Sequence, residues 1–377
     1  MIKGQVYTQN LYTEEELLKN HVCMIPFKHM EMFKDKATLC CGTWLKKELV
    51  YPKDENGKYD YDVWNSEAAQ EVRQSILDGK YTYCDKQICP HLNSLISTGI
   101  TDRGIFVKRD DTDFPHYDFD NIKIDDDCYV KNTPGSLNFT FDWSCNFKCP
   151  SCRVDTIMAK SDEVKEIDGI VEFINKTYSA NCKKILITGS GDPFASKSFR
   201  KFLFNFEPSQ WPELKSVQLI TNGKLFNEKN WNLMKAIQPY VDIVDVSIDA
   251  GTKDTYENKT RLGGHWETLL KNLKFISTIK SINFFRISFF PMFNDTAPLG
   301  ADSDKISWAN AVASSTDQVN PMGSRGHAGV TVSPFLNVSP DTGHVKVPSS
   351  ENGSTSFAST GRNAKYPNNH LGHTNEL

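Results

Sequence analysis

WSCNFKCPSCR, the stretch from Trp143 to Arg153, holds three cysteines within eight residues, at Cys145, Cys149 and Cys152. Three closely spaced thiolates can bind one cubane iron–sulfur cluster, each on a separate iron, so that the fourth iron has no protein ligand. A zinc site completed by a distant ligand and a set of plain structural thiols are the alternatives. The stretch lies between a predicted strand and a predicted helix. At that edge of a parallel sheet ligand-binding residues gather, so the position favours the cluster.

The sequence around this stretch alternates apolar strands with amphipathic helices. Strands are predicted at Leu137 to Phe141, Lys184 to Thr188, Ser216 to Thr221, Ile243 to Ile248 and Phe284 to Phe290. Helices are predicted at Glu163 to Tyr178, Asn227 to Ile237 and Trp266 to Ile279. The expected fold class is therefore α/β, with residues 136–295 forming a partial (β/α)6-type parallel barrel.

The cysteine stretch, its preceding strand and the following βα repeats resemble the core of the radical S-adenosylmethionine (SAM) superfamily. In that family the open iron of a [4Fe-4S] cluster chelates S-adenosylmethionine. An electron from a flavodoxin- or ferredoxin-type donor then cleaves a carbon–sulfur bond and releases a 5′-deoxyadenosyl radical that abstracts a substrate hydrogen. The resemblance implies an enzyme with these cofactors, whose chemistry the protein positions and shields. It implies no particular catalytic side chain.

A glycine-rich turn follows the second strand of the predicted barrel. Gly189, Ser190, Gly191 and Asp192 resemble the family's GGE-type motif, whose backbone and acid hold the amino group of S-adenosylmethionine. The second glycine of that motif is a serine here, and its glutamate is an aspartate. Because the acid is shorter, we expect it to lie closer to the cofactor.

Two further strand ends carry family-like polar residues. Asn222 belongs to a Thr-Asn-Gly ending, and the fourth strand ends in an SIDAG sequence that includes Ser247 and Asp249. The resemblance places these residues among the S-adenosylmethionine contacts, while a helix-capping role is the alternative for Asp249. An aromatic residue usually precedes the last cysteine of the loop, but Ser151 stands there. Adenine stacking is therefore expected from another source, such as Phe147 or the backbone.

A second group of cysteines lies near the N-terminus. Residues 23–94 resemble the SPASM or twitch auxiliary-cluster module of the same superfamily, with matching pieces around the cysteines and in the sequence RQSILDG. The implied ligands of an auxiliary [4Fe-4S] cluster are Cys23, Cys40 or Cys41, Cys84 and Cys89. Zinc in the same tetrathiolate is the alternative. Cys128 and Cys182 have no partner at ligand spacing and are predicted to be plain buried thiols.

The chain divides into four predicted segments. Residues 1–100 form the auxiliary-cluster module, with a helix from Ser66 to Leu77, and the acidic residues 101–135 connect it to the barrel of residues 136–295. Residues 296–377 are rich in Ser, Gly, Asn, Thr and Pro and form an irregular tail. One hairpin is predicted there, pairing residues 330–338 with residues 344–347.

Composition restricts the partners and the compartment. The 377 residues carry a formal charge of −4, so no basic field favours a nucleic-acid partner. No apolar run is long enough to span a membrane, and the first 20 residues lack the apolar core of a signal peptide. Ten cysteines in such a chain indicate reduced thiols and metal ligation, so a cytoplasmic location is expected.

The expected function is radical chemistry on an unidentified substrate. Relatives with SPASM or twitch modules favour a peptide, a protein or a sugar. Two alternatives stand beside it: a non-catalytic iron–sulfur or zinc protein, and a radical enzyme that acts on RNA or a nucleotide.

Overall fold

The computed structural model describes residues 12–99, 104–109, 127–188 and 190–288, together with short strands in the C-terminal part of the chain. Its centre is an eight-stranded sheet with the order β10-β9-β8-β7-β6-β2-β3-β4. The strands are β2 (His29–Met32), β3 (Lys36–Thr38), β4 (Leu49–Val50), β6 (Ser136–Phe139), β7 (Lys184–Ile187), β8 (Ser216–Thr221), β9 (Val241–Ser247) and β10 (Phe284–Ser288). From β10 to β2 neighbouring strands are parallel, whereas β3 and β4 are antiparallel.

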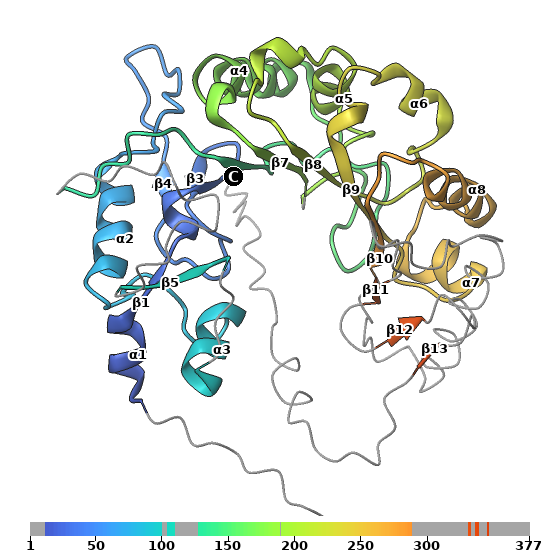
Figure 1. Cartoon of the computed structure of the whole chain (residues 1–377). Coiled ribbons are helices and arrows are strands. Elements are labelled where there is room, and N and C mark those ends of the chain that lie inside the picture. Colours follow the sequence, from blue (N-terminus) through green and yellow to red (C-terminus); the bar gives the residue numbers. More distant parts are fainter. Residues whose placement is uncertain are drawn as a thin grey trace, which may run out of the picture.

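Helices cover one face of the parallel strands, and the sheet curves away from them (Figure 1). They are α4 (Ser161–Thr177), α5 (Lys197–Phe204), α6 (Glu228–Leu233), α7 (Lys253–Thr255), which continues as a π-helix over Tyr256–Thr260, and α8 (Trp266–Ser277). The ring of Phe139 on β6 packs against the rings of Phe199 and Phe202 on α5. Alternate residues of the strands therefore enter an apolar layer under the helices, and the residues between them face the opposite, concave side.

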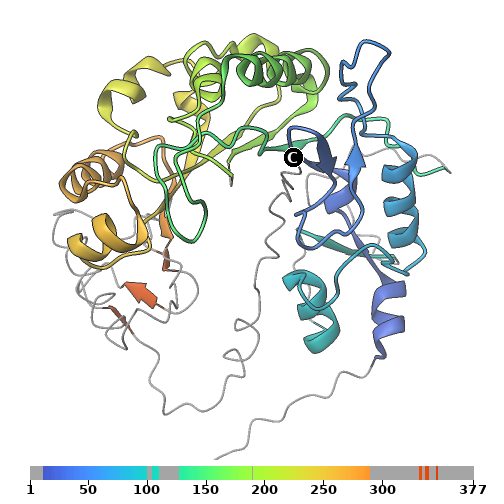
Figure 2. The same ribbon diagram turned by 180° about the vertical axis from the view of Figure 1, so that it is seen from behind.

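The N-terminal part contributes α1 (Glu14–Asn20), β1 (His21–Cys23), α2 (Glu67–Leu77), α3 (Pro90–Thr98) and β5 (Phe106–Lys108). Figure 2 shows these elements grouped at one end of the sheet. The guanidinium of the fully buried Arg73 on α2 donates to the carbonyl oxygens of Pro26 and Trp64 and to Asn65 Oδ1, at 2.7–3.0 Å. One side chain thus joins α2 to the chain that leads from β1 into β2.

The structure agrees closely with the predicted barrel elements. All five predicted strands occur, with bounds that move by no more than a few residues. The helix predicted to reach Ile237 ends earlier, at Leu233, and a short 3-10 helix at Gln238–Tyr240 follows. The helix ends there because Met234 leaves the helical conformation, with φ −105° and ψ 36°, and its backbone N–H donates to the carbonyl oxygen of Trp231.

Two predicted segment boundaries are crossed by sheet pairing. Strand β5 lies inside the segment predicted as a connection and pairs antiparallel with β1, while residues 110–126 of that segment lie outside the described residues. Strand β2 belongs to the N-terminal segment and yet pairs in parallel with β6. The N-terminal part is therefore continuous with the sheet that carries the cysteine loop.

The predicted C-terminal hairpin appears in part. Strand β12 (Leu336–Val338) pairs antiparallel with β13 (Val345–Lys346), and β11 (Thr331–Val332) pairs with β12. Residues 330–338 thus supply two strands rather than one. Pro334 falls between them, and proline cannot donate a ladder hydrogen bond. Among the described helices, none is both long and apolar enough to cross a bilayer.

Candidate functional site

Cys145, Cys149 and Cys152 lie in the loop that leaves the carboxyl end of β6. The backbone N–H of Cys145 donates to the carbonyl oxygen of Ile157 at 2.7 Å, which closes this cysteine loop, residues 143–158, on itself. Cys145 and Cys149 are buried, and Cys152 is exposed. Burial raises the pKa of the Cys145 and Cys149 thiols, and each also interacts electrostatically with the next cysteine of the loop. The three sulfurs therefore share one site.

Gly191 packs closely against the backbone at the start of the cysteine loop. A Cβ atom on this residue would lie 2.6 Å from the carbonyl oxygens of both Asp142 and Ser144. Only glycine permits such a close approach of two backbones. Its neighbour Ser190 donates from its hydroxyl to the carbonyl oxygen of Thr140 at 2.9 Å, while Gly189 lies outside the described residues.

The carboxylate of Asp192 is fully buried and fully hydrogen-bonded. Its Oδ1 accepts from the backbone N–H groups of Phe194 and Ala195 at 3.0 and 3.1 Å. Its Oδ2 accepts from the Thr221 hydroxyl and the Asn222 N–H, both at 2.8 Å. Burial raises the pKa of Asp192, although these four donors oppose the rise. In this arrangement the acid joins the turn after β7 to the end of β8; its contact with a cofactor stays a prediction.

Asn222 connects the end of β8 to the cysteine loop. Its Nδ2 donates to the side-chain oxygen of Asn146 at 2.9 Å and points at the sulfur of Cys145 at 3.8 Å. Ser247 is the last residue of β9 and is half-buried. The structure thus brings Asn222 to the cysteine loop and puts Ser247 at a neighbouring strand end, while the contact of either residue with S-adenosylmethionine stays a prediction.

Asp249 forms a buried ion pair that sequence reasoning does not reveal. Its φ of 55° is left-handed, and its Oδ2 lies 2.6 Å from an Nη of Arg261. The other Nη of Arg261 donates to Cys149 Sγ at 3.7 Å. Burial opposes the charge of Arg261, but the Asp249 carboxylate and the Cys149 thiol together raise its pKa. Arg261 is therefore a charged neighbour of a predicted cluster ligand. The sequence signal for a role of Arg261 is its place in the family-like R-x-GG sequence, Arg261 to Gly264, which follows the fourth strand.

Arg153 is a second arginine at the cluster loop. It donates to the carbonyl oxygens of Trp143 and Ser190, both at 2.8 Å, and to the sulfur of Cys152 at 3.4 Å. These contacts join the two ends of the cysteine loop to the turn after β7. The only sequence signal for this role is the position of Arg153 directly after the last cysteine.

The donor groups around the loop fit an iron–sulfur cluster. Within the described residues, Asn146 Nδ2 and the hydroxyl of Tyr256 are buried without a hydrogen-bond partner. Tyr256 interacts electrostatically with Cys149, and its ring packs edge-on against Phe147 at 6.3 Å. Unpaired buried donors are rare in native proteins and call for an acceptor such as a bound group. The sulfurs of a cluster held by three thiolates would supply acceptors at this position.

The suggestion that Phe147 stacks on adenine is wrong for this structure. Phe147 has no exposed surface, because its ring packs against Tyr256 and its Cα lies 3.8 Å from where a side chain on Gly263 would begin. The backbone N–H of Lys148 also donates to the carbonyl oxygen of Leu262 at 3.0 Å. Phe147 therefore anchors the loop. Trp143 is the exposed aromatic side chain of this stretch, with 51% of its surface accessible.

The concave face of the sheet carries polar side chains. Asp245 on β9 accepts from Gln218 Nε2 on β8 at 2.6 Å and from an Nη of Arg286 on β10 at 2.7 Å. At the other end of the face, Asn138 Nδ2 on β6 donates to Glu31 on β2 at 2.9 Å. Burial raises the pKa of Glu31 to about 7. The polar side chains of this face are therefore paired with one another across neighbouring strands.

Four of the N-terminal cysteines converge, although they come from separate elements. Cys23 ends β1, Cys40 follows β3, Cys84 lies in the loop after α2, and Cys89 caps α3. Burial raises the pKa of Cys23 and Cys84 to about 12, and the charges of Cys84 and Cys89 add to the shift at Cys23. These thiols are therefore near one another in a region with little solvent.

The structure distinguishes Cys40 from Cys41. Burial raises the pKa of Cys40, and Cys23, Cys89 and Cys84 all raise it further. Cys41 is less buried, interacts with Cys89, and lies with its sulfur 3.2 Å from the hydroxyl of Thr43. Cys40 is therefore the more buried of the two adjacent thiols, and it interacts with Cys23, Cys84 and Cys89.

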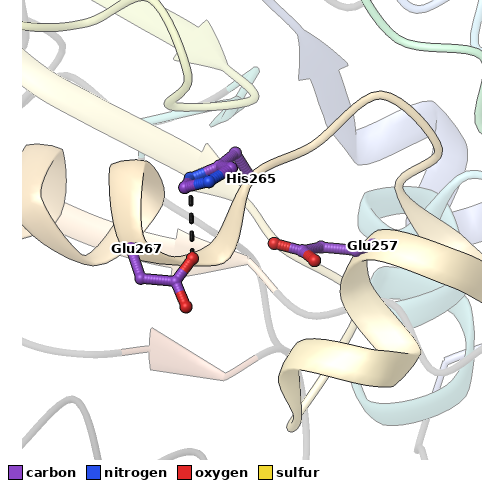
Figure 3. Close-up of side chains that lie close together, drawn as sticks. All are labelled: Glu257, His265 and Glu267. Atoms are coloured by element: carbon purple, nitrogen blue, oxygen red, sulfur yellow. Dashed lines mark ion pairs between the residues drawn. The ribbon is translucent and has the colours of Figure 1, made fainter.

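Another set of possible metal ligands lies at the start of α8 (Figure 3). Single ligand atoms of Glu257, His265 and Glu267 lie within 4.8 Å of one another. Glu257 accepts from the backbone N–H of Trp266 at 2.7 Å, and Glu267 pairs with Lys253 at 2.6 Å. His265 caps the helix through Nδ1, which accepts from the N–H of Thr268. Helix capping and ion pairing thus account for all three side chains without a metal ion.

Residues 144–298 match the family profile of the Radical SAM superfamily. An S-adenosylmethionine-dependent nucleotide dehydratase (RSAD2) from Oncorhynchus mykiss is 29% identical over 144 residues, covering 37% of this chain and 39% of that protein. A GTP 3′,8-cyclase from Helicobacter pylori (strain HPAG1) is 30% identical over 155 residues, covering 37% of this chain and 45% of that protein. The chain thus spans less than half the length of these curated relatives.

Two solved structures show partial similarity. SuiB of Streptococcus suis, bound to the precursor peptide SuiA, gives a TM-score of 0.30 at 16% identity over 42% of this chain and 33% of that chain. TYW1 with a lysine-pyruvate adduct gives a TM-score of 0.29 at 16% identity over 48% of this chain and 60% of that chain.

Proposed function

We propose that the chain is an enzyme that reductively cleaves S-adenosylmethionine and uses the product radical to remove a hydrogen atom from a substrate, because residues 144–298 match the family profile of the Radical SAM superfamily. The observation that carries this proposal is the cysteine loop, with three neighbouring sulfurs at the carboxyl end of β6 and unpartnered donors beside them. The six parallel strands with helices on one face support a partial (β/α)6-type barrel.

The residues of the chain would bind and orient the cofactors. Cys145, Cys149 and Cys152 would hold a [4Fe-4S] cluster, and Gly191 would keep their loop against the turn after β7. The cluster, when bound, supplies one electron to S-adenosylmethionine. S-adenosylmethionine would lie against the strand ends. Its predicted contacts are Gly189, Ser190, Gly191, Asp192, Asn222, Ser247 and Asp249. For Asp192 we propose an indirect role, because its two oxygens already accept four hydrogen bonds.

The N-terminal thiols would bind an auxiliary [4Fe-4S] cluster through Cys23, Cys40, Cys84 and Cys89. Their electrostatic coupling supports this set and favours Cys40 over Cys41. Measuring iron, sulfide and zinc in the reconstituted Cys40→Ser and Cys41→Ser variants tests it. Loss of about four irons in Cys40→Ser alone is expected. Equal loss in both variants, or stoichiometric zinc, would contradict the assignment.

The substrate class has two candidates. The SPASM-like cysteines favour a peptide, a protein or a sugar. The names of two relatives, a nucleotide dehydratase and a GTP cyclase, favour a nucleotide. The polar concave face, with Arg286 held against Asp245, is compatible with either class.

Anaerobic reconstitution followed by an assay for 5′-deoxyadenosine tests the proposed reaction. The protein, reduced with dithionite, should convert S-adenosylmethionine to 5′-deoxyadenosine and methionine, and the right substrate class should increase the rate. Nucleoside triphosphates and cell-extract peptides are the two panels to compare. A fully iron-loaded protein that yields no 5′-deoxyadenosine with any panel would favour the non-catalytic alternative.

A further inference from the structure

Each of the three cysteines in the loop meets a nitrogen donor from a different part of the chain. Asn222 Nδ2 lies 3.8 Å from Cys145 Sγ. An Nη of Arg261 lies 3.7 Å from Cys149 Sγ, and an Nη of Arg153 lies 3.4 Å from Cys152 Sγ. Arg153 directly follows Cys152 in the sequence, whereas the fold brings Asn222 and Arg261 to the loop from distant positions.

The two arginines are fixed by further contacts, so neither side chain is free to turn away. Arg261 pairs with Asp249 at 2.6 Å, and Arg153 donates to two carbonyl oxygens at 2.8 Å. The two arginines differ in whether a carboxylate balances their positive charge. The carboxylate of Asp249 balances Arg261, whereas the partners that the structure describes for Arg153 are carbonyl oxygens and the Cys152 sulfur. Among the described residues no carboxylate pairs with Arg153, so its positive charge at a predicted ligand has no such partner to balance it.

Hydrogen bonds and nearby charge are two of the factors that set the reduction potential of an iron–sulfur cluster. Reduction by one electron makes the cluster more negative, and a fixed cation at a ligand sulfur stabilises the more negative state. An external one-electron donor supplies that electron. The charge of Arg153 should therefore make the cluster easier to reduce, and the charge-balanced Arg261 should have a smaller effect.

We propose that Arg153 is a positioning residue that holds Cys152 and raises the reduction potential of the cluster bound by Cys145, Cys149 and Cys152. This inference rests on the proposed function. Arg153 touches a cluster ligand and the backbone of two loops, and no role in substrate contact is assigned to it.

The test uses the full chain, reconstituted anaerobically, with Arg153→Gln, Arg153→Lys and the control Lys201→Gln, which removes an exposed cation of α5 that pairs with Asp168 on α4 at 2.7 Å. Redox titration followed by electron paramagnetic resonance gives the midpoint potential, and the signal that S-adenosylmethionine alters identifies this cluster. We expect Arg153→Gln to lower the equilibrium constant for reduction about tenfold, which is about 59 mV for one electron. Arg153→Lys should recover most of that loss, and Lys201→Gln should match the wild type.

Four results are decisive. An unchanged potential in an iron-loaded Arg153→Gln protein would overturn the inference, while leaving the proposed function intact. Iron loss in both Arg153→Gln and Arg153→Lys would also overturn it, because the side chain would then be a structural tie only. Iron loss in Arg153→Gln alone would support the need for charge, since lysine cannot rebuild the two carbonyl contacts together. A wild-type protein without a signal that responds to S-adenosylmethionine would instead refute the proposed function.

Discussion

At the scale of single residues, a crowded glycine and an uncrowded glycine test how closely the backbone packs against the cysteine loop. Gly191 lies under the cysteine loop, where a Cβ would meet two carbonyl oxygens at 2.6 Å. Gly169 lies in the middle of α4, where a Cβ would meet no atom within 4 Å. The same substitution to alanine should therefore have opposite effects at the two positions.

For Gly191→Ala we expect a loss of about 1–3 kcal/mol in the free energy of unfolding, the usual range for overpacking. The cysteine loop should move, so iron bound by this loop should fall. Gly169→Ala is the matched control. It should gain about 0.5–1 kcal/mol, because glycine is a poor residue for a helix interior. Urea unfolding and iron content measure both effects, and a stable, fully iron-loaded Gly191→Ala protein would show that the loop is less closely packed than described.

Cys149→Ala is the direct residue test of the radical site. The sulfur is buried and lies beside Arg261, so no nearby thiol can replace it. We expect formation of 5′-deoxyadenosine to fall to background, while the N-terminal thiols still bind iron. Turnover at more than a few per cent of the wild-type rate would mean that Cys149 is not a ligand.

At the scale of elements, the pairing of β2 with β6 predicts a pH effect on stability. Glu31 faces Asn138 across this parallel pair, and burial raises the pKa of Glu31 from 4.5 to about 7. Between those pH values the folded state holds a proton that the unfolded state has released. The free energy of unfolding therefore falls as pH rises through this range. Below about pH 4.5 both states are protonated, so the contribution vanishes.

Glu31→Gln isolates that effect, because the amide oxygen can still accept from Asn138. The variant should be more stable relative to wild type at pH 8 than at pH 5, as measured by urea unfolding at both values. Other titrating groups are common to the two proteins and cancel in the difference. An equal difference at both pH values would mean that Glu31 is ionised in the folded state at pH 5.

The elements also show what local sequence could and could not predict. The strand from Ser216 to Thr221 was predicted with its observed bounds, because an apolar run with turn residues after it is a local signal. The pairing of β2 with β6, and the ion pair of Asp249 with Arg261, join residues far apart in the sequence. Such contacts leave no periodic pattern, so they emerge only from the fold.

At the scale of the whole molecule, one sheet joins the N-terminal part, which carries Cys23, Cys40, Cys84 and Cys89, to strands within residues 144–298, the range that matches the Radical SAM superfamily profile. The family-like motifs single out the cysteines of the two predicted cluster sites. They could not separate Cys40 from Cys41, since the two are adjacent and of the same type, and burial together with the surrounding thiols favours Cys40. Sequence position marked Arg153 and Arg261, but their contacts with the sulfurs of Cys152 and Cys149 could not be predicted without the fold.

Truncation after Asn294 tests how far the cluster site depends on the C-terminal part. The described contacts of the cysteine loop reach no further than Gly264, so the shortened protein should still bind the central cluster. Iron content and the visible absorption of the cluster measure this. Loss of the central cluster on truncation would show that residues after 294 support the site.

The most direct test of the central claim is electron paramagnetic resonance of the dithionite-reduced protein with and without S-adenosylmethionine. We expect a [4Fe-4S] signal that changes when S-adenosylmethionine is added. The signal should disappear in a variant with Cys145, Cys149 and Cys152 replaced by alanine. A signal that is indifferent to S-adenosylmethionine, or that survives the triple replacement unchanged, would contradict the assignment of the cysteine loop as the radical-generating site.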